Sequence, residues 1–119
     1  MNVTVTTVPE EQLSPLQKTH LQLAREFVED VNLHPANIHN SVKIIGAYDM
    51  KAERIFVAPE RLQRLSTTAN TSIHELAHHE SKADDGTQAH EASISDITHR
   101  IALCASSGKY DYLLSEAIW

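Results

Sequence analysis

The chain has 119 residues and a mass of 13.3 kDa, a usual size for one domain. Its 41% hydrophobic residues suffice for an ordinary globular core, and its single cysteine excludes an internal disulfide and is typical of a reducing compartment. The net charge of −6 argues against a nucleic-acid partner, because phosphate binding needs clustered Lys and Arg side chains. We therefore expect a single domain over residues 1–119 that binds no nucleic acid.

The N-terminus has no basic region followed by an apolar run, so no signal peptide is visible. No stretch approaches the roughly 20 apolar residues of a membrane span. These two observations predict a cytoplasmic protein without a membrane partner.

The beginning of the chain predicts a strand or arm followed by a helix. Residues 1–12 are rich in Thr and Val and predict an edge strand or a loose arm. Ser14 followed by Pro15 is typical of a helix N-cap and first helical residue. The spacing of the apolar side chains then predicts a helix over about 15–31, which His34-Pro35 ends.

The middle of the chain predicts a β-hairpin. The runs 42–48 and 54–58 are β-branched or aromatic, and a short polar connection joins them. Together with the helices around them, these runs predict an α+β fold. We expect the sheet of this fold to be small and mostly antiparallel.

Two further long helices follow the hairpin. Pro59 begins the first, in which apolar residues recur at three- and four-residue spacing and predict a helix to about residue 80. Thr87 can cap the second, over about 88–106, and a short last helix is expected within 110–119.

The helix that begins at Pro59 contains the sequence His74-Glu75-Leu76-Ala77-His78, an H-E-x-x-H pattern. Four residues are just over one helical turn, so both imidazoles leave one face and two ring nitrogens can bind one Zn²⁺. Glu75 is turned by about 100° and can reach a water on the open position of the metal, from which it would take a proton. The pattern therefore predicts one catalytic zinc ion with His74 and His78 as ligands and Glu75 as the catalytic base.

A catalytic zinc needs a third protein ligand, and three residues after His78 are candidates. Asp84 has the spacing of the last metzincin ligand, but Ser81 stands where that pattern needs glycine for a sharp exit from the helix. His90 and Glu91 both lie in the first turn of the next predicted helix. The apolar stripe of that helix slightly favours His90, and chemistry alone leaves both open.

The segment with Ile73 to His78, a polar loop with Asp85-Gly86-Thr87 and then Glu91 resembles the minimal gluzincin arrangement, H-E-x-x-H followed by a glutamate on the next helix. Residues 42–101 also resemble metallopeptidase domains found beside histidine-kinase and chaperone-type ATPase domains. The resemblance implies a minimal zincin fold, in which a small sheet packs on the H-E-x-x-H helix and on a following ligand-bearing helix. It implies Glu91 as the third zinc ligand, beside His74 and His78.

Two parts of the site are left open by the sequence. The gluzincin position of an aspartate that orients a zinc-bound histidine is Ser95 here, and Asp96 is the neighbouring candidate. Candidates for a group that stabilises the oxyanion are His99, Tyr110 and Tyr112.

The sequence thus predicts a zinc-dependent peptidase that acts on a peptide or protein substrate. Two alternatives remain: a non-catalytic zincin-like module for binding or regulation, and a zinc amidohydrolase acting on a non-peptide amide. The apolar residues 115–119 also raise the hypothesis that the C-terminal segment lies in the cleft and holds the protein in a latent form.

Overall fold

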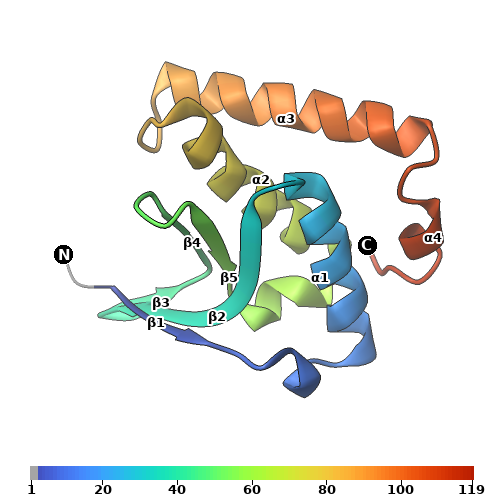
Figure 1. The fold of residues 1–119 in the computed structure, drawn as a ribbon, viewed down its shortest axis with the longest axis horizontal. Coiled ribbons are helices and arrows are strands. Elements are labelled where there is room, and N and C mark those ends of the chain that lie inside the picture. The colour runs from blue at the N-terminus through green and yellow to red at the C-terminus, as the bar shows by residue number, and fades with distance from the viewer. Residues whose placement is uncertain (1–2) are drawn as a thin grey trace.

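The computed structural model describes residues 3–119 and combines a mixed β-sheet with α-helices (Figure 1). The expected α+β class is therefore confirmed. The strands are β1 (Thr4–Thr7), β2 (Asn32–Asn40), β3 (Val42–Ile44), β4 (Gly46–Asp49) and β5 (Arg54–Val57). The α-helices are α1 (Pro15–Val28), α2 (Leu65–Ser81), α3 (Gln88–Ser106) and α4 (Asp111–Leu114), and the short 3-10 helices are η1 (Glu10–Gln12) and η2 (Pro59–Gln63).

The sheet has the strand order β1-β2-β5-β4, and β3 pairs with β2 beside this path. The β2–β5 pairing is parallel, while the β1–β2, β2–β3 and β4–β5 pairings are antiparallel. The predicted hairpin is confirmed in β4 and β5, but the front of its first run forms β3 and pairs elsewhere. Within the described residues β4 is the last strand of the order, so one of its edges has no partner strand.

Strand β2 was not predicted, because His34-Pro35 indicated only the end of a helix. The carbonyl oxygen of Pro35 accepts a hydrogen bond from the N–H of Val8, at 3.0 Å. The backbone nitrogen and oxygen of a strand residue face the same edge, so the proline nitrogen also faces Val8 and not β5. No hydrogen bond to β5 is lost, and the strand continues through the proline.

Two helices differ from their predicted bounds. Helix α1 begins at Pro15 with a capping box between Ser14 and Gln17, as expected, but ends at Val28. The helix predicted from Pro59 is interrupted at Arg64, whose extended backbone (φ −136°, ψ 149°) separates η2 from α2. Helix α3 and its Thr87 cap lie where the sequence predicts them.

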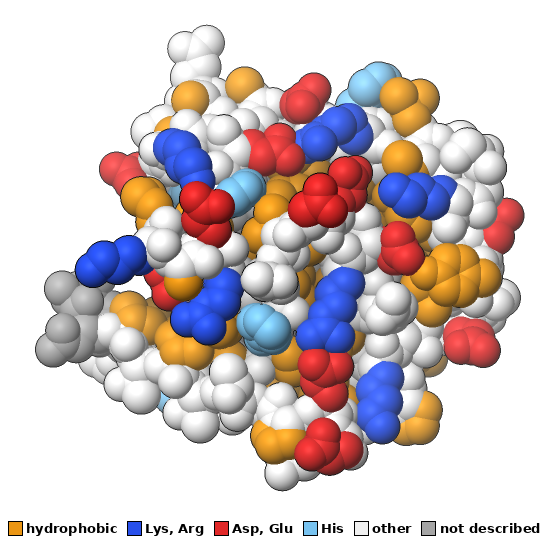
Figure 2. Space-filling view, in the orientation of Figure 1, with side chains coloured by type: hydrophobic (Ala, Val, Ile, Leu, Met, Phe, Trp, Pro, Cys, Tyr) orange, Lys and Arg blue, Asp and Glu red, His pale blue; other side chains and the backbone are white. Residues whose placement is uncertain are grey.

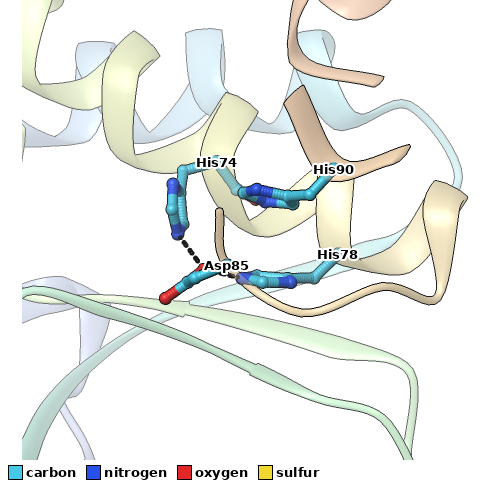
Figure 3. A group of neighbouring side chains, drawn as sticks. All are labelled: His74, His78, Asp85 and His90. Atoms are coloured by element: carbon cyan, nitrogen blue, oxygen red, sulfur yellow. Dashed lines mark hydrogen bonds and ion pairs between the residues drawn. The ribbon is translucent and has the colours of Figure 1, made fainter. Parts of the chain in front are cut away.

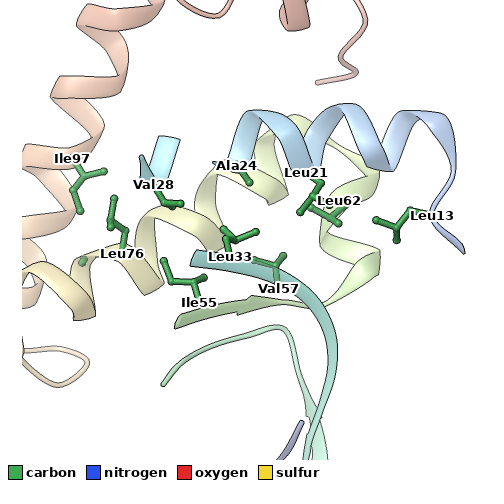
Figure 4. Close-up of a cluster of buried hydrophobic side chains, with 11 residues drawn as sticks. Leu13, Leu21, Ala24, Val28, Leu33, Ile55, Val57, Leu62, Leu76 and Ile97 are labelled. Carbon is green, nitrogen blue, oxygen red and sulfur yellow. The ribbon is translucent and has the colours of Figure 1, made fainter. Parts of the chain in front are cut away.

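The main core lies between the sheet and helices α1 and α2 (Figure 4). Alternation along β5 directs Ile55 and Val57 to these helices, while Phe56 packs on the other face of the sheet. Helix α3 lies across α2 and adds Ile97 to the same cluster (Figure 1). The buried residues of the main cluster are Leu13, Leu21, Ala24, Val28, Leu33, Ile55, Val57, Leu62, Leu76, Ala77 and Ile97.

The C-terminal segment packs at the N-terminal end of α2. The N–H of Leu65 donates to the carbonyl oxygen of Ile118 at 2.6 Å, so a backbone group caps a helix that has no side-chain cap. The fully buried ring of His20 links this segment to η2: its Nε2 accepts from the N–H of Ile118 at 3.0 Å, and its Nδ1–H donates to the oxygen of Leu62 at 2.6 Å.

Acidic and basic side chains are interspersed on the face drawn in Figure 2, and the Lys and Arg side chains there form no continuous basic surface. In the described part of the chain, no helix is both long enough and apolar enough to cross a membrane.

Candidate metal centre

Helix α2 brings His74 and His78 together on one face, as the four-residue spacing predicts. Their ring centroids lie 5.0 Å apart. The helix ends at Ser81, and the C-cap residue Lys82 adopts a left-handed conformation with φ of 54° and turns the loop back toward His78.

His90 brings a third imidazole to the same place (Figure 3). It lies in the first turn of α3, where its N–H donates to the hydroxyl of the N-cap residue Thr87 at 3.1 Å. Its ring stacks on that of His78 at 4.1 Å and lies 4.7 Å from that of His74. The side chain is buried, with 2% of its surface exposed. Three imidazoles from two helices therefore meet at one point.

Backbone carbonyls fix the orientation of two of these rings. The Nδ1–H of His78 donates to the oxygen of Ala83 at 2.8 Å, and the Nε2–H of His90 donates to the oxygen of His74 at 3.1 Å. Because these bonds use the Nδ1 of His78 and the Nε2 of His90, the nitrogens that remain for an ion are the Nε2 of His78 and the Nδ1 of His90. Such an outer hydrogen bond is typical of histidines that bind metals.

Asp85, in the loop between α2 and α3, completes the group. Its Oδ1 lies 2.9 Å from the Nε2 of His74 and 2.6 Å from the Nε2 of His78. One donor atom from each of His74, His78, Asp85 and His90 lies within 4.8 Å of all the others, so this group could hold a metal ion. Partial burial raises the pKa of Asp85, but the charges of the two histidines and their hydrogen bonds together bring it below its usual value.

The structure does not bring Glu91 into this group. Adjacent residues of a helix point about 100° apart, and α3 turns His90 toward α2 while the side chain of Glu91 is exposed. The third imidazole is therefore His90, the alternative that the sequence left open. The aspartates considered for other roles also lie outside: Asp84 is exposed, and Asp96 is exposed and paired with Arg100.

Glu75 lies beside the group with only 7% of its surface exposed. Burial raises the pKa of Glu75 from 4.5 to about 7, against a lowering by the charge of His78. Burial also lowers the pKa of His74, which favours its neutral, metal-binding form. The centre thus combines imidazole donors with a carboxyl group that titrates near neutral pH.

A pocket of about 270 Å³ opens onto the centre and reaches the edge of the sheet. Gly46 of β4 lines it where the strand crosses α2: a Cβ atom there would lie 2.6 Å from the Cγ2 of Thr71 and 3.1 Å from the Oε2 of Glu75. Only glycine permits this close approach. The residues around the pocket are Ile45, Gly46, Asn70, Thr71, His74, Glu75, His78 and Asp85.

The predicted candidates for an oxyanion-stabilising group do not line this pocket. Tyr110 is buried against Phe27, Tyr112 bonds Glu26, and His99 is an exposed residue of α3. The pocket instead contains Asn70, one helical turn before His74, whose position on the His74–His78 face could have been read from the sequence.

The C-terminal segment also lies outside the pocket. Its backbone bonds Leu65 and Ser66 at the opposite end of α2 from the histidines. The hypothesis that residues 115–119 block the cleft therefore has no support from their position.

Comparison of the chain with known protein families, curated proteins and solved structures gives no match. The properties of the centre therefore rest on its own geometry. Its four donor groups, the buried carboxyl and the adjoining pocket are the observations from which a function can be argued.

Proposed function

We propose that the chain is a zinc-dependent peptidase with a zincin-like arrangement of sheet and helices. In this proposal His74, His78 and His90 bind one zinc ion and Glu75 is the catalytic base. The observation that carries it is the convergence of three imidazoles, two with their outer nitrogens bonded to carbonyl oxygens, beside a buried carboxyl in an open pocket.

The donor set favours zinc. Three histidines are a known ligand set of catalytic zinc, and neutral imidazole suits this borderline-soft ion better than it suits Mg²⁺ or Ca²⁺. The lowered pKa of His74 favours the neutral ring at physiological pH. When bound, the ion would lower the pKa of a water molecule and polarise a carbonyl group of the substrate.

Glu75 has the position and the pKa for proton transfer. It lines the pocket beside His74 and His78, and a carboxyl with a pKa of about 7 can both accept and return a proton at neutral pH. Glu75 would take the proton of the attacking water as oxygen bonds to the carbonyl carbon. It would then give that proton to the amide nitrogen, which leaves as an amine.

The edge of the sheet supports a peptide as the substrate. Ile45 and Gly46 line the pocket, and β4 is the terminal strand of the sheet among residues 3–119. The unpaired backbone groups of an edge strand can bond an extended peptide as an added strand. Such binding would lay the peptide backbone along the pocket, near Glu75.

The proposal is tested by metal analysis and peptide cleavage. Purified protein should contain one zinc per chain and should cleave members of a broad peptide library, with loss of activity in EDTA and recovery on addition of zinc. Glu75→Gln should keep the zinc and lose hydrolysis, by about 100-fold or more. Glu80→Gln is a matched control, because Glu80 is an exposed residue of the same helix. Undiminished cleavage by Glu75→Gln would refute the assigned base.

One observation favours a non-catalytic site as the second candidate. Asp85 supplies a fourth donor, and zinc with four protein ligands is usually structural. In that case the protein would bind zinc and gain stability from it, but would cleave no member of the library.

A further inference from the structure

Asp85 differs from the three histidines in how it is held. The histidines project from helices, and the rings of His78 and His90 are fixed by carbonyl oxygens. Asp85 lies in the loop between α2 and α3, and 72% of its side chain is exposed. Rotation about its own side-chain bonds would move the carboxylate into solvent without moving a helix.

The loop around Asp85 is held on one side and open on the other. The oxygen of Asp84 accepts hydrogen bonds from the N–H and the hydroxyl of Thr87, which tie that residue to the start of α3. Gly86, next to Asp85, has a φ of +76°, and apart from its two chain neighbours no residue lies within 4 Å of the place where a Cβ would stand. The loop is therefore open beside Asp85, whose side chain is itself largely exposed.

Asp85 also occupies the side of the centre that faces the pocket. It lines the pocket together with Glu75, whereas the buried His90 does not line it. The place filled by the carboxylate is thus the one that Glu75 and an incoming substrate can reach. A catalytic zinc needs that place for water or substrate, whereas a structural zinc keeps all four protein ligands.

We propose that Asp85 is a displaceable fourth ligand, which closes the coordination of the metal in the resting protein and leaves it when water or a substrate carbonyl binds. This inference rests on the proposed metal site, but not on peptide cleavage. Departure of the carboxylate would remove one negative charge from the ligand set and leave three neutral imidazoles. The ion would then be a stronger Lewis acid than with the carboxylate bound.

The test uses the cobalt(II) form of the full chain and azide as a probe of the fourth position, with visible absorption as the measurement. In the wild type Asp85 should compete with azide. If the carboxylate is bound for nine-tenths of the time, Asp85→Ala should bind azide about tenfold more tightly. Asp84→Ala is the matched control, because Asp84 is the neighbouring exposed acid outside the donor group, and its azide affinity should equal that of the wild type.

Two results would overturn the inference. If Asp85→Ala has the cobalt spectrum and azide affinity of the wild type, Asp85 is not a ligand. If Asp85→Ala binds no cobalt, as expected for His74→Ala, Asp85 is a permanent ligand that cannot be displaced. Failure of this inference and failure of the proposed function are distinguishable. If Asp85→Ala binds azide more tightly but the wild type cleaves no peptide, Asp85 is a displaceable ligand and the protein is not a peptidase. If the wild type takes up no cobalt, both proposals are refuted.

Discussion

The Nε2–H of His90 donates a hydrogen bond to the carbonyl oxygen of His74, at a distance of 3.1 Å. This bond joins the first turn of α3 to the backbone of the H-E-x-x-H helix and holds the ring of His90 beside those of His74 and His78. One ligand of the proposed centre is thus oriented by the backbone of another.

The first prediction separates His90 from Glu91. His90→Ala should lower zinc affinity by about 100-fold or more, because it removes one of three imidazoles from the site, whereas Glu91→Ala should change it less than about threefold. Competition with a chromophoric chelator measures both affinities. A larger loss of zinc affinity in Glu91→Ala than in His90→Ala would identify Glu91 as the third ligand, as the gluzincin resemblance implied.

The sequence could predict part of this site for a physical reason. His74, Glu75 and His78 lie within one helical turn, so their geometry is local and follows from the spacing alone. The choice between His90 and Glu91 depends on the rotation of α3 about its axis, which is set by the packing of Ile97 on α2. The apolar stripe of this helix indicates that rotation only approximately, because His90 and Glu91 are adjacent and both lie near the stripe. Asp85 was missed because its place depends on an irregular loop.

The second prediction concerns pH and the metal-free protein. Burial raises the pKa of Glu75 in the folded protein from 4.5 to about 7, so between these values the folded state binds a proton that the unfolded state has lost. The free energy of unfolding should therefore fall as the pH rises from about 4.5 to 7, by at most about 3 kcal/mol. Burial lowers the pKa of His74 in the folded protein below 6.5, so the unfolded state binds a proton first as the pH falls. The free energy of unfolding therefore falls as the pH drops below 6.5, an effect opposite in sign to that of Glu75.

Glu75→Gln isolates the contribution of the glutamate. In urea unfolding with EDTA at several pH values, the wild type should lose stability relative to Glu75→Gln as the pH rises toward 8. At pH 5 the two proteins should differ least, because Glu75 is protonated there. Unfolding curves that keep a constant separation across this range would contradict the raised pKa.

The third prediction concerns the crossing of β4 and α2. Gly46→Ala would place a Cβ atom 2.6 Å from the Cγ2 of Thr71, a stiff β-branched side chain on a helix. The strain should lower the free energy of unfolding by about 1–3 kcal/mol and displace Glu75 from the reacting water, which should lower kcat. Urea unfolding and peptide cleavage measure the two effects.

Thr71→Ser is the rescue variant for this prediction. Serine lacks the Cγ2 methyl group but keeps the hydroxyl that accepts a hydrogen bond from the Nε of Arg61, at 2.9 Å in the wild type. The double variant Gly46→Ala/Thr71→Ser should therefore recover much of the stability lost in Gly46→Ala. If the losses of stability in Gly46→Ala and Thr71→Ser simply add in the double variant, the contact with the methyl group does not cause the strain of Gly46→Ala.

The fold was predictable where patterns are local. The Ser14 and Thr87 caps and the β4–β5 hairpin follow from short stretches of sequence. Strand β2 was missed because it contains Pro35. A proline is tolerated there only because its nitrogen faces away from β5, and that orientation depends on tertiary pairing. His20 also gave no local sign of its burial, because Leu62 and Ile118, its partners, are far away in the sequence.

The last prediction concerns this buried histidine. His20→Ala should lower the free energy of unfolding by about 2–4 kcal/mol, because it leaves a cavity and removes the partners of the Leu62 carbonyl and the Ile118 N–H. The loss should also loosen the segment that caps α2 at Leu65, so the first turn of α2 should exchange its amide hydrogens faster. His39→Ala is the matched control, since His39 is exposed on β2 and should change stability by less than about 0.5 kcal/mol. Equal losses in the two variants would mean that the bridge through His20 does not stabilise the H-E-x-x-H helix.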